Sequence, residues 1–124
     1  MLASEKIIGF VPISDAARAR SFYAEKLGLK FVSEDSFAVV FDANGNMLRL
    51  TRVQEVRPQP FTILGWQVSD ITTTVRQLGA AGVEFERYGE FMQQDDLGIW
   101  DAPGGSRVAW FKDPDGNILS VSQH

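Results

Sequence analysis

One stretch of the sequence occurs twice and decides the fold. Residues 42–51 read DANGNMLRLT, and residues 113–122 read DPDGNILSVS. In each copy a turn dipeptide, Asn44-Gly45 or Asp115-Gly116, leads into an apolar strand pattern. The runs before the turns, FAVVF and RVAWF, then supply the antiparallel partner strands. The repeat predicts two β-hairpins of the same design.

The repetition continues toward the N-terminal side of each hairpin. Residues 6–15, KIIGFVPISD, match residues 61–70, FTILGWQVSD, as an apolar run that ends in Ser-Asp. The closing aspartate of each run is a suitable helix N-cap, and apolar residues follow it at helical spacing. Gly28 or Gly82 ends each helix and opens a short strand, LGLKF or AGVEF.

Each half of the chain is therefore read as one strand, one helix and three further strands. We predict an α+β fold in which two βαβββ modules form a mixed sheet that encloses a cleft, with the helices outside. The chain of 124 residues is too short for two independently stable domains. We expect a single domain over 1–124, with module one at 1–58 and module two at 59–124. The cleft closes within one chain or between two chains of a dimer.

The second module is longer than the first. The copies begin 55 residues apart and end 71 residues apart, so sixteen residues are added between Tyr88 and Ser106. This segment is either a lid or binding loop, or a strand with a long hairpin turn. In a lid, Met92, Trp100 and the turn at 103–105 would be the binding parts.

Composition limits the partners. The net charge is -4 and no run of Lys or Arg occurs, which argues against nucleic acid and against an anionic membrane surface. No apolar stretch is long enough to span a bilayer, and the cytoplasm is the expected location. The absence of cysteine removes thiolate sites. A small molecule or another protein is the expected partner.

Strand alternation separates the residues that face the cleft from those that pack under the helices. The more uniformly apolar set should be the core: Val11, Ile13, Leu48, Leu50, Leu64, Trp66, Val68, Leu119 and Val121. The candidate ligand-binding residues are polar or aromatic side chains of the other faces and of the added segment: Phe10, Arg49, Gln67, Met92, Trp100, Trp110 and Ser120.

Each of these candidates has a structural alternative. Arg49 can bind a carboxylate or phosphate, or it can pair with an acidic side chain or reach solvent. Gln67 can orient a ligand or satisfy a backbone group. Trp100 and Trp110 offer flat faces to an aromatic ligand, but core packing or a dimer contact is an equal alternative. His124 is the only histidine and is expected to be frayed, so a Ser-His-Asp arrangement is unsupported.

The motifs FYAEKLG at 22–28 and DPDGN at 113–117, at opposite ends of two matched halves, resemble the vicinal oxygen chelate superfamily. That group includes glyoxalases, bleomycin resistance proteins and extradiol dioxygenases. The resemblance implies a homodimer and, in metal-binding relatives, four ligands on the first and last strands of the two halves. The corresponding residues here are Ile8, Arg49, Ile63 and Ser120. None is a usual ligand, so we predict no metal and no other cofactor.

Three functions follow. The first is a metal-independent binding protein that sequesters a drug or metabolite in an apolar, aromatic cleft. The alternative is a glyoxalase-like or dioxygenase-like enzyme whose divalent metal is held by ligands not identified from the sequence. A third is a metal-free enzyme in which Arg49 acts electrostatically on an anionic substrate. The sequence leaves open whether the chain is an enzyme.

Overall fold

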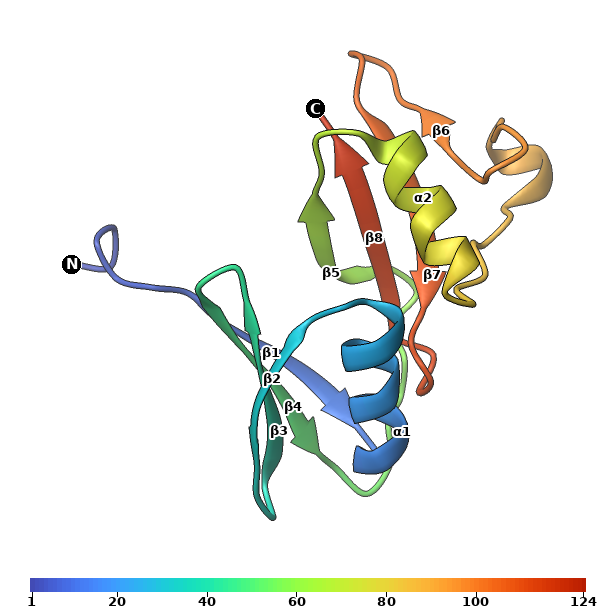
Figure 1. Cartoon of the computed structure of the whole chain (residues 1–124). Coiled ribbons are helices and arrows are strands. Elements are labelled where there is room, and N and C mark those ends of the chain that lie inside the picture. Colours follow the sequence, from blue (N-terminus) through green and yellow to red (C-terminus); the bar gives the residue numbers. More distant parts are fainter. The chain divides into compact units, whose positions relative to one another are not determined.

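The computed structural model describes residues 1–124 and divides into two compact units, 1–57 and 58–124. The first unit is a four-stranded mixed sheet with helical turns packed on one face (Figure 1). The strand order is β1-β4-β3-β2; β1 runs parallel to β4, and the other pairs are antiparallel. Its elements are β1 (Ile8–Ile13), α1 (Ala16–Ser21), η1 (Phe22–Lys26), β2 (Lys30–Glu34), β3 (Ala38–Ala43) and β4 (Asn46–Arg52).

The second unit repeats this topology. Its sheet has the order β5-β8-β7-β6, with β5 parallel to β8 and the remaining pairs antiparallel. Its elements are β5 (Thr62–Gln67), α2 (Ile71–Ala80), η2 (Gly89–Phe91), β6 (Trp100–Asp101), β7 (Arg107–Lys112) and β8 (Ile118–Gln123). The predicted α+β fold with two βαβββ modules is confirmed. No helix in either unit has the length and apolar character that crossing a membrane requires.

The helix ends follow the sequence signals. Asp15 Oδ1 accepts a hydrogen bond from the Arg18 amide at 3.1 Å, and Asp70 Oδ1 accepts one from the Thr73 amide at 3.1 Å. Both carboxylates thus satisfy amides that the first helical turn leaves free. Gly28 has a φ of 73°, the left-handed conformation that ends a helix at low cost only for glycine.

The first helix differs from the single α-helix that the spacing predicts. After Ser21 it widens into the π-helical turn η1, in which the Leu27 amide donates to the Phe22 carbonyl at 3.1 Å. The side chains of Phe22 and Tyr23 are consecutive, yet both are buried, and their rings meet edge to face at 5.4 Å. A wider turn accommodates two neighbouring large side chains on the sheet side, which an apolar spacing of 3.6 residues does not encode.

The core of each unit lies between the sheet and the helix. Six of the predicted core residues are buried, namely Val11, Ile13, Leu48, Leu50, Leu119 and Val121. Each such aliphatic side chain contributes roughly 1.5–3 kcal/mol through burial. Leu64, Trp66 and Val68 are only half-buried. The assignment of the helix-facing side therefore holds for both sheets, with looser packing along β5.

The short strand predicted at 81–85 does not form. Only Phe85 makes a bridge, to Phe111 of β7, and the Glu86 amide donates to the Trp110 carbonyl at 2.8 Å. The edge of β7 is completed instead by Trp100, which pairs with Val108. The partner strand of β7 is thus split into two pieces, because the added segment leaves the sheet after Glu86 and returns at β6.

The two hairpin turns, although alike in sequence, differ in geometry. Asn44 and Gly45 both have positive φ, 53° and 88°, as a two-residue type I′ turn requires. In the second turn only Gly116 has positive φ, and the buried Asp113 carboxylate accepts hydrogen bonds from the amides of Asp115 and Asn117, both at 3.0 Å. These acidic and amide residues form turns, as their repetition predicts.

The expectation that His124 is frayed is wrong. Its Nδ1 lies 3.0 Å from Ser106 Oγ, and its Nε2 lies 3.0 Å from Ser122 Oγ. Ser122 belongs to β8 and Ser106 immediately precedes β7, so two hydroxyl groups hold the imidazole against the end of the second sheet.

Candidate functional site: the open faces of the two sheets

The face of the first sheet that lies away from α1 is apolar and exposed. Leu48 and Leu50 point to the helix side, so alternation along β4 places Met47 and Arg49 on this open face. Met47 pairs with Ile8 of β1, and Arg49 pairs with Phe10. The apolar side chains here keep large exposed fractions, 46% for Ile8, 63% for Phe10 and 43% for Met47. Such a surface is a candidate binding face.

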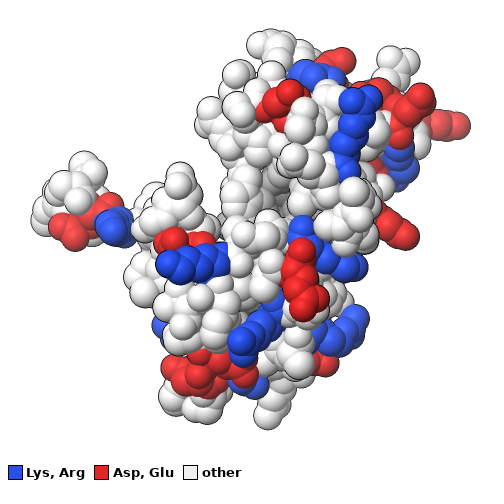
Figure 2. All heavy atoms as spheres, viewed as in Figure 1, with Lys and Arg blue, Asp and Glu red and all other residues white.

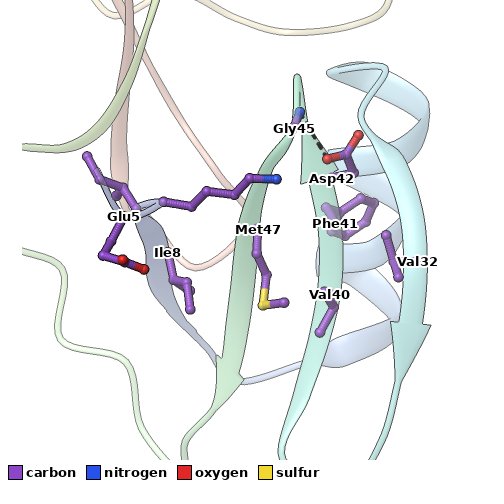
Figure 3. Close-up of a pocket in the computed structure, with 10 residues that line it drawn as sticks. Glu5, Ile8, Val32, Val40, Phe41, Asp42, Gly45 and Met47 are labelled. Carbon is purple, nitrogen blue, oxygen red and sulfur yellow. Dashed lines mark hydrogen bonds between the residues drawn. The ribbon is translucent and has the colours of Figure 1, made fainter. Parts of the chain in front are cut away.

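A pocket of about 490 Å³ opens on this face (Figure 3). Its lining residues come from the segment before β1 and from all four strands or the turn between β3 and β4: Glu5, Lys6, Ile7, Ile8, Val32, Val40, Phe41, Asp42, Gly45 and Met47. The walls are mainly aliphatic, with charged groups only at Glu5, Lys6 and Asp42. The volume lies in the range typical of small-molecule sites.

The open face of the second sheet carries a group of three aromatic rings. The ring centroids of Trp100 and Trp110 are 6.0 Å apart, and Tyr88 meets Trp110 edge to face at 5.5 Å. Trp110 Nε1 donates a hydrogen bond to Thr62 Oγ1 at 3.0 Å. Since β8 lies between β5 and β7, the indole of Trp110 extends across β8. Burial, followed by the charge of Glu86, raises the pKa of the Tyr88 hydroxyl.

Two polar side chains beside these rings have no partner within the chain. Ser120 pairs across the sheet with Trp110 on one side and with Gly65 on the other, and Gln67 pairs with Ser122. Neither the Ser120 hydroxyl nor the Gln67 amide makes a hydrogen bond, and no buried side-chain polar atom lacks one. The exposed Gln67 amide is accessible to water or to a ligand, whereas Ser120 is buried, with 9% of its surface exposed.

The added segment is an ordered hairpin arm. Gln94 Oε1 accepts from the Tyr88 amide at 2.8 Å, while Gln94 Nε2 donates to the carbonyls of Glu86 and Gly98 at 2.9 and 2.8 Å. One side chain thus satisfies backbone groups that a continuous strand would have paired. The same arrangement places Tyr88 beside Trp110.

The structure brings together some of the predicted site residues. Phe10 and Arg49 are neighbours on the first sheet. Trp100, Trp110, Ser120 and Gln67 lie on strands of the second sheet, whereas Met92 follows η2 in the added segment, outside the strands. The sequence reasoning did not select Tyr88, Thr62 or the pocket residues Val32 and Asp42. Ile8 and Met47 could have been selected from the sequence, because strand alternation already assigned them to the open face.

The positions that correspond to metal ligands do not fit a divalent metal ion. Ile8 offers no donor atom, and the guanidinium of Arg49 repels a cation. A bulge in β5 between Thr62 and Leu64 interrupts the alternation at Ile63, and the residue paired with Ser120 is Gly65. No group of three or more His, Cys, Asp or Glu side chains lies close enough to hold a metal ion.

The charges on the visible surface are mixed. Figure 2 shows Lys and Arg side chains interspersed with Asp and Glu over each unit, without a continuous basic region on the face shown. Several of these neighbours are ion pairs, including Arg52 with Glu34 at 2.9 Å and Arg107 with Asp101 at 2.9 Å. This face lacks the basic stripe that a nucleic-acid backbone attracts.

The chain belongs to the Glyoxalase/Bleomycin resistance protein/Dioxygenase superfamily, because the family model matches residues 7–121. The topology of the two sheets agrees with this assignment. The resemblance predicted from the sequence is confirmed. A search of curated protein sequences found no match.

Solved structures with similar folds have diverse functions. Lactoylglutathione lyase from Agrobacterium tumefaciens has a TM-score of 0.74 at 19% identity, over 97% of this chain and 93% of that one. An antibiotic-binding protein from Streptomyces has a TM-score of 0.73 at 22% identity, over 99% and 98%. A superfamily member from Sphaerobacter thermophilus has a TM-score of 0.74 at 21% identity, over 100% of both chains. At these identities the similarity concerns the fold alone.

Proposed function

We propose that the chain is a metal-independent binding protein for a small apolar or aromatic molecule. The observation that carries the proposal is the pocket of about 490 Å³ on the open face of the first sheet. Its aliphatic walls, formed in part by Ile8, Val32 and Met47, favour a ligand with an apolar body. The antibiotic-binding protein from Streptomyces, which shares the fold, supports a sequestering role for a drug or metabolite.

The chemistry of the side chains favours binding over metal-dependent turnover. A Lewis-acid reaction needs several oxygen or nitrogen donors around one ion, with open positions for substrate. The positions Ile8 and Arg49 of the first unit supply no such donors. The glyoxalase-like or dioxygenase-like alternative therefore requires a ligand set elsewhere.

Filling the pocket tests the proposal. Ile8 is 46% exposed, so an Ile8→Trp variant places a larger apolar group in the pocket without disturbing the buried core. Val53→Trp is the matched control, because Val53 is an exposed apolar residue that does not line the pocket. Compounds that raise the melting temperature of the wild-type chain should lose affinity at least tenfold for Ile8→Trp and keep it for Val53→Trp. Equal affinity for both variants would place the ligand elsewhere.

Elemental analysis tests the absence of a metal. The purified chain, refolded in turn with nickel, zinc, manganese and iron, should retain less than stoichiometric metal after gel filtration. A tightly bound stoichiometric ion would support the metal-dependent enzyme instead. The homodimer expected from the resemblance stays a prediction, which sedimentation velocity of the same samples addresses.

A further inference from the structure

Arg49 is a half-buried cation whose charge, after the hydrogen bonds from the amides of Phe37 and Ala38, helps to lower the pKa of Asp35. It lies at the middle of β4, between Phe10 of β1 and Val40 of β3, on the open face of the first sheet. Its side chain makes no hydrogen bond and no ion pair within the chain. Arg107, the other half-buried arginine, pairs with Asp101 at 2.9 Å.

The nearby carboxylates are already engaged. Glu34 pairs with Arg52 at 2.9 Å and with Arg20 at 3.5 Å. Asp35 Oδ1 accepts hydrogen bonds from the amides of Phe37 at 2.7 Å and Ala38 at 2.9 Å. A guanidinium always carries its charge and offers five donors. No buried side-chain nitrogen lacks a partner, so the Arg49 donors face water, which a bound acceptor can displace.

The pocket begins next to Arg49. Val40 both lines the pocket and pairs with Arg49. The pair Ile8–Met47, which forms part of the pocket wall, lies two residues along the strands from the pair Phe10–Arg49, a separation of about 7 Å. An apolar molecule in the pocket can therefore reach the guanidinium with a group at its end.

The charges of the pocket favour one orientation for an anion. Asp42 lies beside the turn at Gly45 (Figure 3). It pairs with Met47, whereas Arg49 pairs with Val40, two residues farther from the turn. Glu5 adds a second carboxylate before β1, against the single ammonium of Lys6. An anionic group is attracted toward Arg49 and repelled by the two carboxylates.

We infer that Arg49 and the adjoining pocket together select amphipathic anions, with the oxyanion bound by the Arg49 guanidinium and the apolar body in the pocket. This inference rests on the proposed function and adds the ligand class to it. A planar carboxylate is the best fit, because the guanidinium can donate two parallel hydrogen bonds to it.

Matched probes that differ only in charge test the inference. Isothermal titration compares 2-naphthoate with 2-naphthamide, and benzoate with benzamide, on the wild-type chain. The acids should bind at least about tenfold more tightly than the amides, as a charge-assisted hydrogen bond predicts. 2-Naphthyl phosphate is a third probe. If it binds more tightly than 2-naphthoate, the site is an oxyanion site whose ligand is a phosphate.

Variants assign the preference to Arg49. Arg49→Met, which keeps the length of the side chain and removes its charge, should reduce the acid-to-amide ratio to about one while the amide affinity stays unchanged. Arg49→Lys should keep a part of the preference, because it retains the charge and loses the two-pronged geometry. Arg52→Met is the control, since Arg52 lies on the same strand and is paired with Glu34.

The outcomes separate this inference from the proposed function. If acids and amides bind the wild-type chain equally and both lose affinity for Ile8→Trp, the role of Arg49 is overturned and the pocket function stays intact. An acid preference that survives in Arg49→Met would also overturn it. Failure of every probe to bind would refute the pocket function, and the anion inference with it.

Discussion

Trp110 of β7 is joined to Thr62 of β5 by a hydrogen bond of 3.0 Å from the indole Nε1 to the hydroxyl oxygen. The two strands are not neighbours, because β8 separates them. The indole is therefore held at both ends, by its own backbone in β7 and by Thr62 at the edge of the sheet. Its contacts with Trp100 and Tyr88 then fix the aromatic group as a unit.

Replacement of Thr62 should loosen this arrangement. Thr62→Val removes the acceptor at nearly constant volume and leaves the indole N–H without its partner, so we expect the free energy of unfolding to fall by about 1 kcal/mol. Thr62→Ser keeps the hydroxyl and serves as the control. Urea denaturation followed by tryptophan fluorescence measures both. Equal stability of the valine and serine variants would mean that the bond adds nothing.

Gly65 should tolerate a side chain only when Ser120 is shortened. A Cβ atom at Gly65 would lie 2.7 Å from Ser120 Oγ and 3.4 Å from the Ser120 carbonyl oxygen. Gly65→Ala should therefore cost about 1–3 kcal/mol of unfolding free energy. Adding Ser120→Ala should recover most of that loss, with Ser120→Ala alone as the reference of the double-mutant cycle. Strictly additive effects would contradict this contact.

Asp70 should make the second unit sensitive to acid. The amide and the hydroxyl of Thr73 donate to its carboxylate and lower the pKa of Asp70 from its ordinary value of 3.8. A lowered pKa in the folded state contributes stability above pH 3.8, and this contribution is lost as the pH falls through the folded-state pKa.

Asp70→Asn keeps an oxygen to cap α2 but removes the titration. Its melting temperature should fall less steeply below pH 4 than that of the wild-type chain. Asp96→Asn is the control, because the exposed Asp96 carboxylate accepts no hydrogen bond. Calorimetry between pH 7 and pH 2.5 measures the slopes, and a parallel decline of all three proteins would refute the assignment.

Gln94 should control the order of the added segment. Gln94→Glu keeps the acceptor for the Tyr88 amide but turns a carboxylate oxygen toward the carbonyls of Glu86 and Gly98. Losing two donated bonds at roughly 1 kcal/mol each should speed hydrogen exchange across 86–99 about tenfold or more. The exposed neighbour Gln93, changed to Glu, is the charge-matched control. Unchanged exchange in Gln94→Glu would show that the segment is held by other contacts.

The fold could be predicted from the sequence because its signals are local and repeated. The Asn44-Gly45 turn, the N-caps at Asp15 and Asp70, and the apolar sides of β4 and β8 each depend on residues close together in the chain. Repetition then reinforced every local signal with a second copy. Arg49 was placed on an open face by the same alternation.

The candidate site was only partly predictable because its details depend on irregularities. Alternation alone would place Thr62 on the helix side with Leu64, and the bulge in β5 reverses that for Thr62. Tyr88 reaches Trp110 only because the strand predicted at 81–85 is reduced to a bridge. Bulges and broken strands result from many long-range contacts, and a short stretch of sequence does not reveal those contacts.

The split partner strand of β7 has a practical consequence. The added segment leaves the sheet near Phe85, opposite Phe111, and returns at Trp100, opposite Val108. Both attachment points lie on one strand, and that strand is already held by β8 on its other side. The exposed residues between them can be exchanged or lengthened as a cassette, provided that the buried Ile99, Gly98 with its φ of 91° and the hydrogen-bonded Gln94 are kept. A library built on the other residues of 88–98 would vary the surroundings of Trp110 while the rest of the sheet supplies a constant scaffold for engineering new receptors.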